Sequence, residues 1–198
     1  MASSDYVDPL RSSTEHKLNT AKTKKEDGDQ AFKQGDTKAA LKAYHESLMF
    51  LLGIDKSALQ SLGLSQPLPS ASDATKDPKT KERTEIDEII EKIYANMAAC
   101  HIKNQNWKRA VETADKALQK NEENYKALFR KAKALGEQGF FEKASKILED
   151  IKSKSPADAA SATTELARLK VIDDERERAH KQKLKGFLNR KKDDKATD

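Results

Sequence analysis

A short pattern recurs along this 198-residue chain at an interval of 34 residues. Two segments, 106–111 and 139–144, each place an aromatic residue before two polar residues and an alanine. Their alanines, Ala110 and Ala144, are 34 residues apart, and a third copy at 35–41 has threonine in the aromatic position. A fixed period of this length is typical of stacked helix-turn-helix units, so it predicts a repeat architecture.

Each copy also has a small residue twelve positions before its alanine. Two helices that cross closely need small side chains where their backbones approach each other. The spacing therefore fits the crossing point of a helix-turn-helix unit. The three pairs are Gly28 with Ala40, Ala98 with Ala110, and Ala132 with Ala144.

These positions resemble the tetratricopeptide repeat, a helix-turn-helix unit of 34 residues. The resemblance implies an all-α solenoid of three repeats, at residues 21–54, 91–124 and 125–158. The composition agrees, because seven Gly and five Pro in 198 residues leave few interruptions to helices. Pro156 stands where the last unit must stop.

Residues outside the repeats are assigned to a loop, a cap and tails. Residues 55–80 are rich in proline and serine, which predicts an insertion loop, and Thr84 is expected to cap the long helix that follows. Residues 1–20 are polar and are predicted to be disordered. Residues 159–192 predict an extended C-terminal capping helix with a basic end, followed by a tail at 193–198.

The formal net charge of +5 comes mainly from one terminal segment. Residues 176–192 hold eight basic residues and one acid, so the rest of the chain is slightly acidic. A basic helix interrupted by Leu184 and Phe187 can bind an acidic groove or an anionic membrane. A solvated tail that docks on the last repeat is the more ordinary outcome, so only weak membrane contact is expected. No nucleic acid partner is expected, because no RNA- or DNA-binding motif is present.

The sequence contains no recognisable catalytic, metal or cofactor motif. Its four histidines lack metal-binding spacing, and no glycine-rich phosphate loop or nucleophile motif occurs. The single cysteine, Cys100, is expected to be a buried core residue. The N-terminus lacks the pattern of a secretory signal, and no apolar run approaches the ~20 residues of a membrane helix. We therefore expect a cytoplasmic protein that is not an enzyme and has no cofactors.

Polar residues on the first helix of each predicted repeat form the candidate binding site. These helices line the concave groove of a repeat solenoid. Residues four apart share one helix face, and arginine can hold a carboxylate through two hydrogen bonds. The set predicts an anion site, although lysine-rich faces are also common in a chain with 36% charged residues. Its members are Lys25 and Asp29 on the first helix, Asn96 on the second, and Lys126 and Arg130 on the third.

Four of these five residues resemble the carboxylate clamp of co-chaperone tetratricopeptide domains. In that family the clamp binds the C-terminal Glu-Glu-Val-Asp tail of Hsp90 and Hsp70, and the matching positions here are Lys25, Asn96, Lys126 and Arg130. Asp29 departs from the family, which has asparagine there. A carboxylate ~4 Å from the peptide carboxylate would cost about 4 kcal/mol at an effective dielectric near 20, and Lys25 would soften that cost. We therefore expect weak clamp binding, or a ligand with a different end.

A narrower resemblance, carried by residues 39–48, 52–55, 96–100 and 178–183, is to the tetratricopeptide repeat protein nine family. The insertion after the first repeat is similar to that of the large FKBP immunophilins, but no isomerase domain is recognised here, so isomerase activity is not implied. The leading prediction is an adaptor that takes an acidic chaperone tail into its groove. The alternatives are a scaffold that binds another protein, for example a cytoskeletal one, through the inserted hairpin or convex face, and peripheral binding to an anionic surface through the basic helix.

Overall fold

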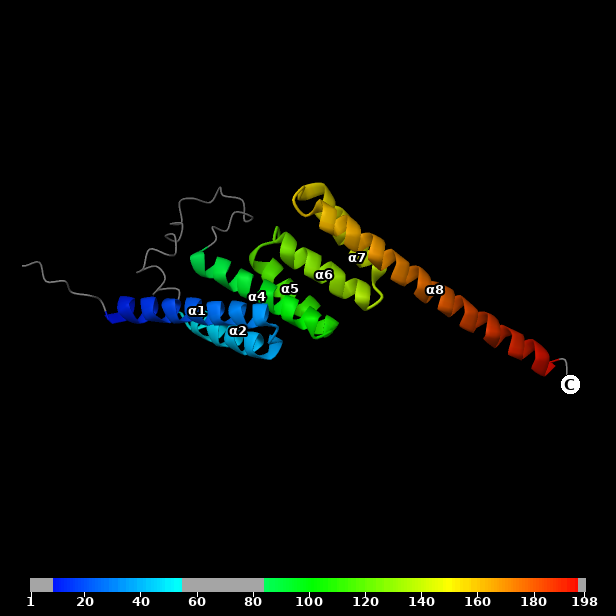
Figure 1. Ribbon diagram of the computed structural model, residues 1–198, viewed down its shortest axis with the longest axis horizontal. Coiled ribbons are helices and arrows are strands. Elements are labelled where there is room, and N and C mark those ends of the chain that lie inside the picture. Colours follow the sequence, from blue (N-terminus) through cyan, green and yellow to red (C-terminus); the bar gives the residue numbers. More distant parts are fainter. Residues whose placement is uncertain (1–8, 55–83, 196–198) are drawn as a thin grey trace, which may run out of the picture. The chain divides into compact units, whose positions relative to one another are not determined.

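A computed structural model describes residues 9–54 and 84–195 of the chain, so the predicted insertion loop lies outside the described residues. The described part is helical and contains no strand, which confirms the all-α prediction. Figure 1 shows the helices in chain order. They are α1 (Pro9–Gln34), α2 (Thr37–Leu52), α4 (Glu85–Lys103), α5 (Trp107–Lys120), α6 (Tyr125–Glu137), α7 (Phe141–Lys154) and α8 (Ala159–Lys195).

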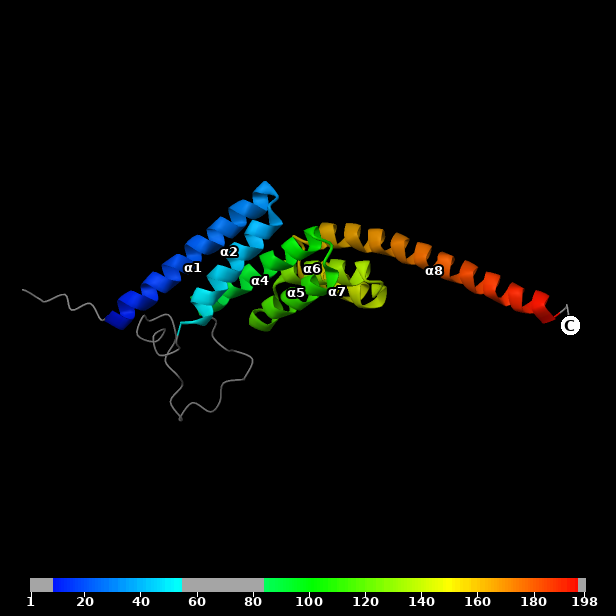
Figure 2. The ribbon, with the colours of Figure 1, turned by 90° about the horizontal axis from the view of Figure 1, so that it is seen from below.

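The chain divides into two compact units, Met1–Arg130 and Lys131–Asp198, and each is described by itself. The first unit holds the hairpin of α1 and α2 and the hairpin of α4 and α5. Figure 2 shows that α1 and α2 lie side by side along their length. The boundary between the units falls within α6, after Arg130.

The two hairpins of the first unit are closed by turns with related chemistry. At the start of α2, Asp36 Oδ1 accepts a hydrogen bond of 2.9 Å from the amide of Ala39. At the start of α5, Asn106 Oδ1 accepts one of 3.3 Å from the amide of Arg109. Such N-caps satisfy an amide that has no partner within the helix. Gly35, just before the first cap, has a φ of +91°, a conformation that glycine adopts without strain.

The small residues predicted at helix crossings are all buried. At Gly28 an added Cβ would lie 2.6 Å from the ring of Tyr44, which no real side chain would tolerate. Because Gly28 has no side chain, the Tyr44 ring of α2 can pack directly against the backbone of α1.

The long helix after the insertion begins where the sequence predicted. Thr84 Oγ1 accepts a hydrogen bond of 3.1 Å from the amide of Asp87, which caps α4. Cys100 is buried in the same core as the α4 isoleucines, as predicted. Those isoleucines, Ile86, Ile89, Ile90 and Ile93, pack with α1 and α2 residues.

The predicted disorder of residues 1–20 is wrong for residues 9–20, which form the first part of α1. Two of these residues, Thr14 and Leu18, are buried. Leu18 packs in one core with Leu51 and Ile54, which lie at and just beyond the end of α2. Because α2 extends beyond an ordinary repeat helix, its apolar end needs cover from a longer α1. Residues 1–8 lie outside the described part.

In the second unit, α7 ends at Lys154, two residues before Pro156, as the sequence predicted. The predicted capping helix, α8, packs against α7 and buries Leu169. A Cβ added at Gly136 would lie 2.4 Å from the Leu169 side chain, so this contact also requires a glycine. The helix continues to Lys195 and corrects the predicted start of the tail at 193, because no Gly or Pro follows Gly186 to end it.

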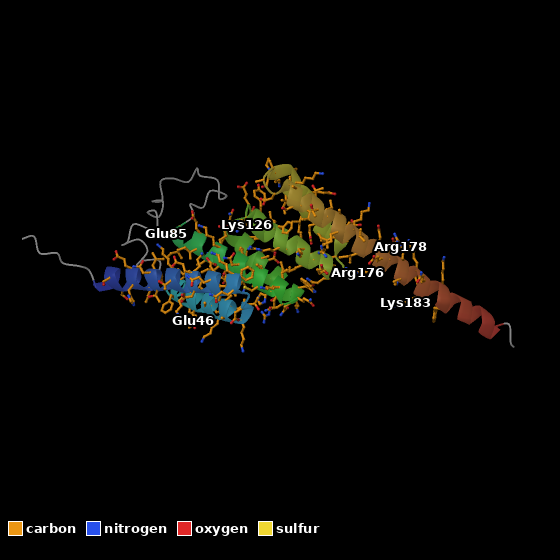
Figure 3. The ribbon with its side chains drawn as sticks, viewed as in Figure 1. Glu46, Glu85, Lys126, Arg176, Arg178 and Lys183 are labelled. Carbon is orange, nitrogen blue, oxygen red and sulfur yellow. The ribbon has the colours of Figure 1, made fainter. Side chains whose placement is uncertain are left out.

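Arg176 of α8 completes the end of α6 within the second unit. Its Nη1 donates to the Gly136 carbonyl at 2.9 Å, and its Nη2 donates to the Glu137 carbonyl at 2.8 Å. The last carbonyls of a helix lack partners within the helix, so a guanidinium placed there stabilises the helix end. Arg176, Arg178 and Lys183 follow one another along α8 in Figure 3.

Candidate functional site

Asp29 is held by three hydrogen-bond donors from α1, α2 and α4. Lys25 Nζ donates to its Oδ2 at 2.6 Å, within the same helix. The hydroxyl of Tyr44 and the Nδ2 of Asn96 both donate to its Oδ1, at 2.6 Å and 2.9 Å. We call these four residues the Asp29 cluster. It contains three of the five residues that the sequence placed at the site.

The charge of Asp29 is stabilised inside this cluster. Partial burial acts to raise the pKa of the Asp29 carboxyl, but the hydrogen bonds from Lys25, Tyr44 and Asn96 outweigh it and the pKa is lowered. Burial and the adjacent carboxylate raise the pKa of the Tyr44 hydroxyl, so Tyr44 keeps its proton and acts as a donor. The carboxylate is therefore ionised and already satisfied.

Arg130, in the part of α6 that belongs to the first unit, is a partly buried cation. Its Nη1 atom has no hydrogen-bond partner among the residues that the structure describes. Burial lowers the pKa of the guanidinium, and Cys100 and Tyr44 are close enough to affect it electrostatically. A buried guanidinium without a full set of acceptors carries a desolvation cost that an anion could offset.

Lys126 lies one helical turn before Arg130, in the first turn of α6, and its side chain is exposed (Figure 3). Within the described ranges it forms no ion pair. We call Lys126 and Arg130 the α6 pair. Residues four apart on a helix share a face, so these two cations can act on one ligand.

The structure thus separates the five predicted residues into two groups with different availability. Lys25 and Asn96 are engaged by Asp29, whereas within the described ranges Arg130 Nη1 has no acceptor and Lys126 forms no ion pair. The sequence pattern missed Tyr44, which is not among the five predicted residues. A signal was present, because Tyr44 is a phenol opposite the glycine of the first small pair, where a hydroxyl can reach across the helix crossing.

The described part of the chain offers neither a metal site nor a membrane-spanning helix. No group of three or more His, Cys, Asp or Glu side chains there could hold a metal ion. None of its helices is long and apolar enough to cross a membrane.

The helical hairpins and the residues at their crossings define a tetratricopeptide architecture. Residues 101–169 match the model of the tetratricopeptide repeat family, so the chain contains tetratricopeptide repeats, as its sequence predicted.

Two curated proteins are similar to parts of the chain. The human zinc finger CCCH domain-containing protein 7B is 32% identical over 113 residues, which are 57% of this chain and 9% of that protein. FK506-binding protein 5 of Rhizopus delemar is 27% identical over 130 residues, which are 66% of this chain and 28% of that protein. The chain therefore spans less than a third of the length of either relative.

Solved tetratricopeptide domains share the fold. The C-terminal TPR-containing domain of an FK506-binding protein from Plasmodium falciparum is 22% identical, with a TM-score of 0.62 over 88% of this chain and 97% of that one. The Hsp90 co-chaperone Cns1 of Saccharomyces cerevisiae is 20% identical, with a TM-score of 0.62 over 88% of this chain and 46% of that one. The first TPR domain of Spaghetti (RPAP3), bound to the Hsp90 peptide SRMEEVD, is 18% identical, with a TM-score of 0.53 over 78% and 96%.

Proposed function

We propose that the protein is a non-enzymatic, co-chaperone-like adaptor that binds the acidic C-terminal peptide of a chaperone of the Hsp90 or Hsp70 type. The observation that carries this proposal is the unpaired, buried Nη1 of Arg130 next to the exposed cation of Lys126. A peptide carboxylate would supply the acceptor that the guanidinium lacks, through a charge-assisted hydrogen bond. A cytoplasmic location is part of the proposal.

The similar structures support the same ligand class. The first TPR domain of Spaghetti (RPAP3) was solved with an Hsp90 peptide, and the TPR2B domain of yeast Sti1 was solved with an Hsp70 peptide. The Hsp90 peptide, SRMEEVD, ends in acidic residues around a valine. The comparisons give no support to the predicted weak membrane contact of α8.

The Asp29 cluster shapes how this ligand would bind. Lys25 and Asn96 donate to Asp29, so an incoming carboxylate meets the α6 pair as its main source of free donors. The repulsion expected from Asp29 is reduced, because Lys25 forms an ion pair with it at 2.6 Å. The proposal is therefore a clamp with two principal cations and modest affinity.

Isothermal titration calorimetry with a pentapeptide that ends in Glu-Glu-Val-Asp tests the proposal. Binding to the wild-type chain is expected to weaken by at least about tenfold in Lys126→Ala/Arg130→Ala, because a charge-assisted contact is lost. The same peptide with an amidated C-terminus should bind the wild-type chain as weakly as the free-acid peptide binds the double variant. Retained affinity in the double variant would overturn the clamp.

Asp29→Asn tests the cluster separately. The amide removes the negative charge and releases Lys25, so affinity for the pentapeptide is expected to rise by about tenfold. Glu26→Gln, which removes a charge from an exposed neighbour on α1, is the matched control and should leave affinity unchanged. Equal affinity of wild type and Asp29→Asn would show that Asp29 does not limit binding.

A further inference from the structure

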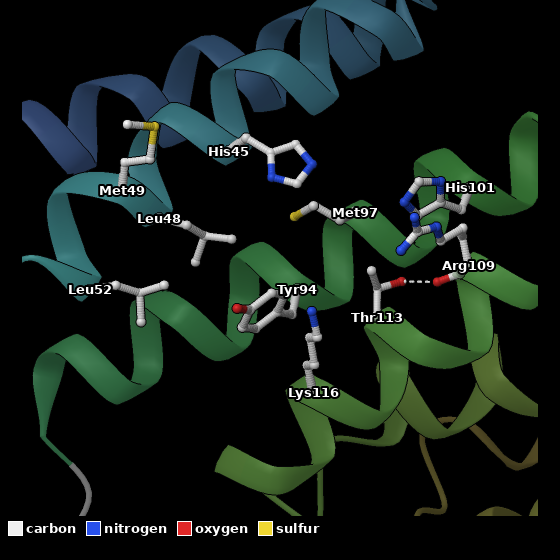
Figure 4. Close-up of a pocket in the computed structure, with 10 residues that line it drawn as sticks. All are labelled: His45, Leu48, Met49, Leu52, Tyr94, Met97, His101, Arg109, Thr113 and Lys116. Carbon is white, nitrogen blue, oxygen red and sulfur yellow. Dashed lines mark hydrogen bonds between the residues drawn. The ribbon is translucent and has the colours of Figure 1, made fainter.

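A hollow of about 410 Å³ lies in the first unit where α2, α4 and α5 meet (Figure 4). None of the residues that line it belongs to the Asp29 cluster or the α6 pair. We call it the Met49 groove. It is a separate surface, so the role proposed for Arg130 does not explain it.

The floor of the Met49 groove is apolar. Leu48 and Met97 are almost fully buried, while Met49 and Leu52 are 75% and 64% exposed. These last two residues stand next to each other on one face of α2, three positions apart. Large apolar side chains that remain exposed around a hollow are typical of a surface that a partner covers.

The rim of the Met49 groove is cationic. His45, His101, Arg109 and Lys116 all line it, and no Asp or Glu does. Arg109 Nη1 pairs with Glu112 at 3.2 Å, but its side chain is 66% exposed and can still meet a ligand. Lys116 Nζ lies 5.5 Å from the centre of the Tyr94 ring, at the wall of the groove.

The apolar and the charged lining residues lie at different ends of the groove. His101 and Arg109 lie together at one end of the groove in Figure 4, where Arg109 supplies the positive charge. Leu48, Met49 and Leu52 lie together at the other end in Figure 4, with Tyr94 and Lys116 between. A ligand is therefore offered apolar contact at one end and positive charge at the other.

We propose that the Met49 groove binds an acidic amphipathic peptide of a partner protein, which places leucine-like side chains against Met49 and Leu52 and carboxylates against Arg109 and Lys116. Charge complementarity selects this occupant, because an apolar peptide without acids leaves the rim unpaired. A second copy of this chain would bring the same cationic rim to a symmetric contact, which repels.

Fluorescence anisotropy tests this with a short labelled peptide of leucine and glutamate, added to the full-length chain. The peptide has an amidated C-terminus, so it lacks the C-terminal carboxylate proposed for the α6 pair. Two comparison peptides replace every glutamate by glutamine or every leucine by serine. Both replacements are expected to weaken binding by about tenfold or more, since the groove needs both contacts.

Variants of the chain locate the binding. Arg109→Glu/Lys116→Glu is expected to weaken binding by about tenfold or more, and Leu52→Ser by several-fold. Lys38→Glu/Lys108→Glu changes the net charge by the same amount, at exposed positions of α2 and α5 outside the groove. This control variant should bind the peptide as the wild type does. Lys126→Ala/Arg130→Ala should also bind as wild type, so failure of the clamp and failure of the groove are distinguishable.

Four outcomes would overturn the proposal. One is no binding of the acidic peptide, and another is equal loss in the two charge-reversal pairs, which would indicate general electrostatic attraction. A third is undiminished binding of the serine peptide. The fourth is a dimer in sedimentation that Leu52→Ser dissolves, which would assign the surface to a second copy.

Discussion

Single side chains decide how closely α1 and α2 approach and what their interface can bind. Gly28 leaves the space that the Tyr44 ring occupies, and that position puts the Tyr44 hydroxyl 2.6 Å from Asp29 Oδ1. The hydrogen bonds to Asp29 therefore depend on a position that itself has no side chain. The close packing of Tyr44 against Gly28 and the hydrogen bond from Tyr44 to Asp29 therefore occur at the same helix crossing.

Gly28→Ala is expected to destabilise the first unit by about 1 to 3 kcal/mol, because overpacking outweighs the gain in helix propensity. The added methyl would lie 2.6 Å from the Tyr44 ring, so the ring or the helix must shift. Urea unfolding followed by circular dichroism measures the change. Asp27→Ala, at an exposed neighbouring position, is the control and should be within about 0.5 kcal/mol of wild type. Equal stability of Gly28→Ala and Asp27→Ala would contradict the packing argument.

The elements show which parts of the fold can be predicted from local sequence. The Thr84 cap and the periodic small residues could be predicted, because each acts within one or two helices. The extent of α1 could not be predicted in this way. Its residues 9–20 are polar, and they are ordered by contact of Leu18 with the end of α2, which is distant in sequence.

Removal of residues 9–20 is therefore expected to destabilise the protein, although the deleted sequence is polar. Burial of Leu18 alone is worth about 2 kcal/mol, and its loss would also expose Leu51. Thermal unfolding of a chain that starts at residue 21 should show a lower midpoint than a chain that starts at residue 9. The point variant Leu18→Ser should account for most of the difference. Identical midpoints for the two truncated chains would mean that this part of α1 adds no stability.

The candidate site was also predictable only in part, for a related reason. Spacing on one helix joined Lys25 to Asp29 and Lys126 to Arg130. It could not show that Asn96 donates to Asp29 across 67 positions of sequence, or that the Nη1 atom of Arg130 is buried with no hydrogen-bond partner among the described residues. Those facts depend on how helices pack, which a pattern along the chain does not contain.

At the scale of the whole molecule, several ionisable groups make folding depend on pH. Burial, with the charges of Arg109 and His45, lowers the pKa of His101 below its ordinary value of 6.5. The unfolded chain then binds that proton at a higher pH than the folded chain, so stability falls as pH decreases through 6.5. The lowered pKa of Asp29 acts in a separate window, since its contribution is lost only as pH falls below about 3.8.

His101→Gln is therefore expected to flatten the fall in stability of the folded protein between about pH 7.5 and pH 5. Urea midpoints measured across this range for the wild type and the variant provide the test. His16→Gln removes an exposed histidine of α1 and is the control. Its plot of stability against pH should keep the wild-type slope. The same slope in His101→Gln as in wild type would show that His101 does not set this dependence.

The Asp29 cluster also has a consequence for the history of such a domain. Aspartate and asparagine codons differ by a single base, so one substitution converts a position that holds Lys25 and Asn96 internally into one that frees them for a ligand. The core contacts of Gly28 and Tyr44 would not change. The peptide binding proposed for this surface could therefore be strengthened or weakened by selection without a new fold, a new helix or a new repeat.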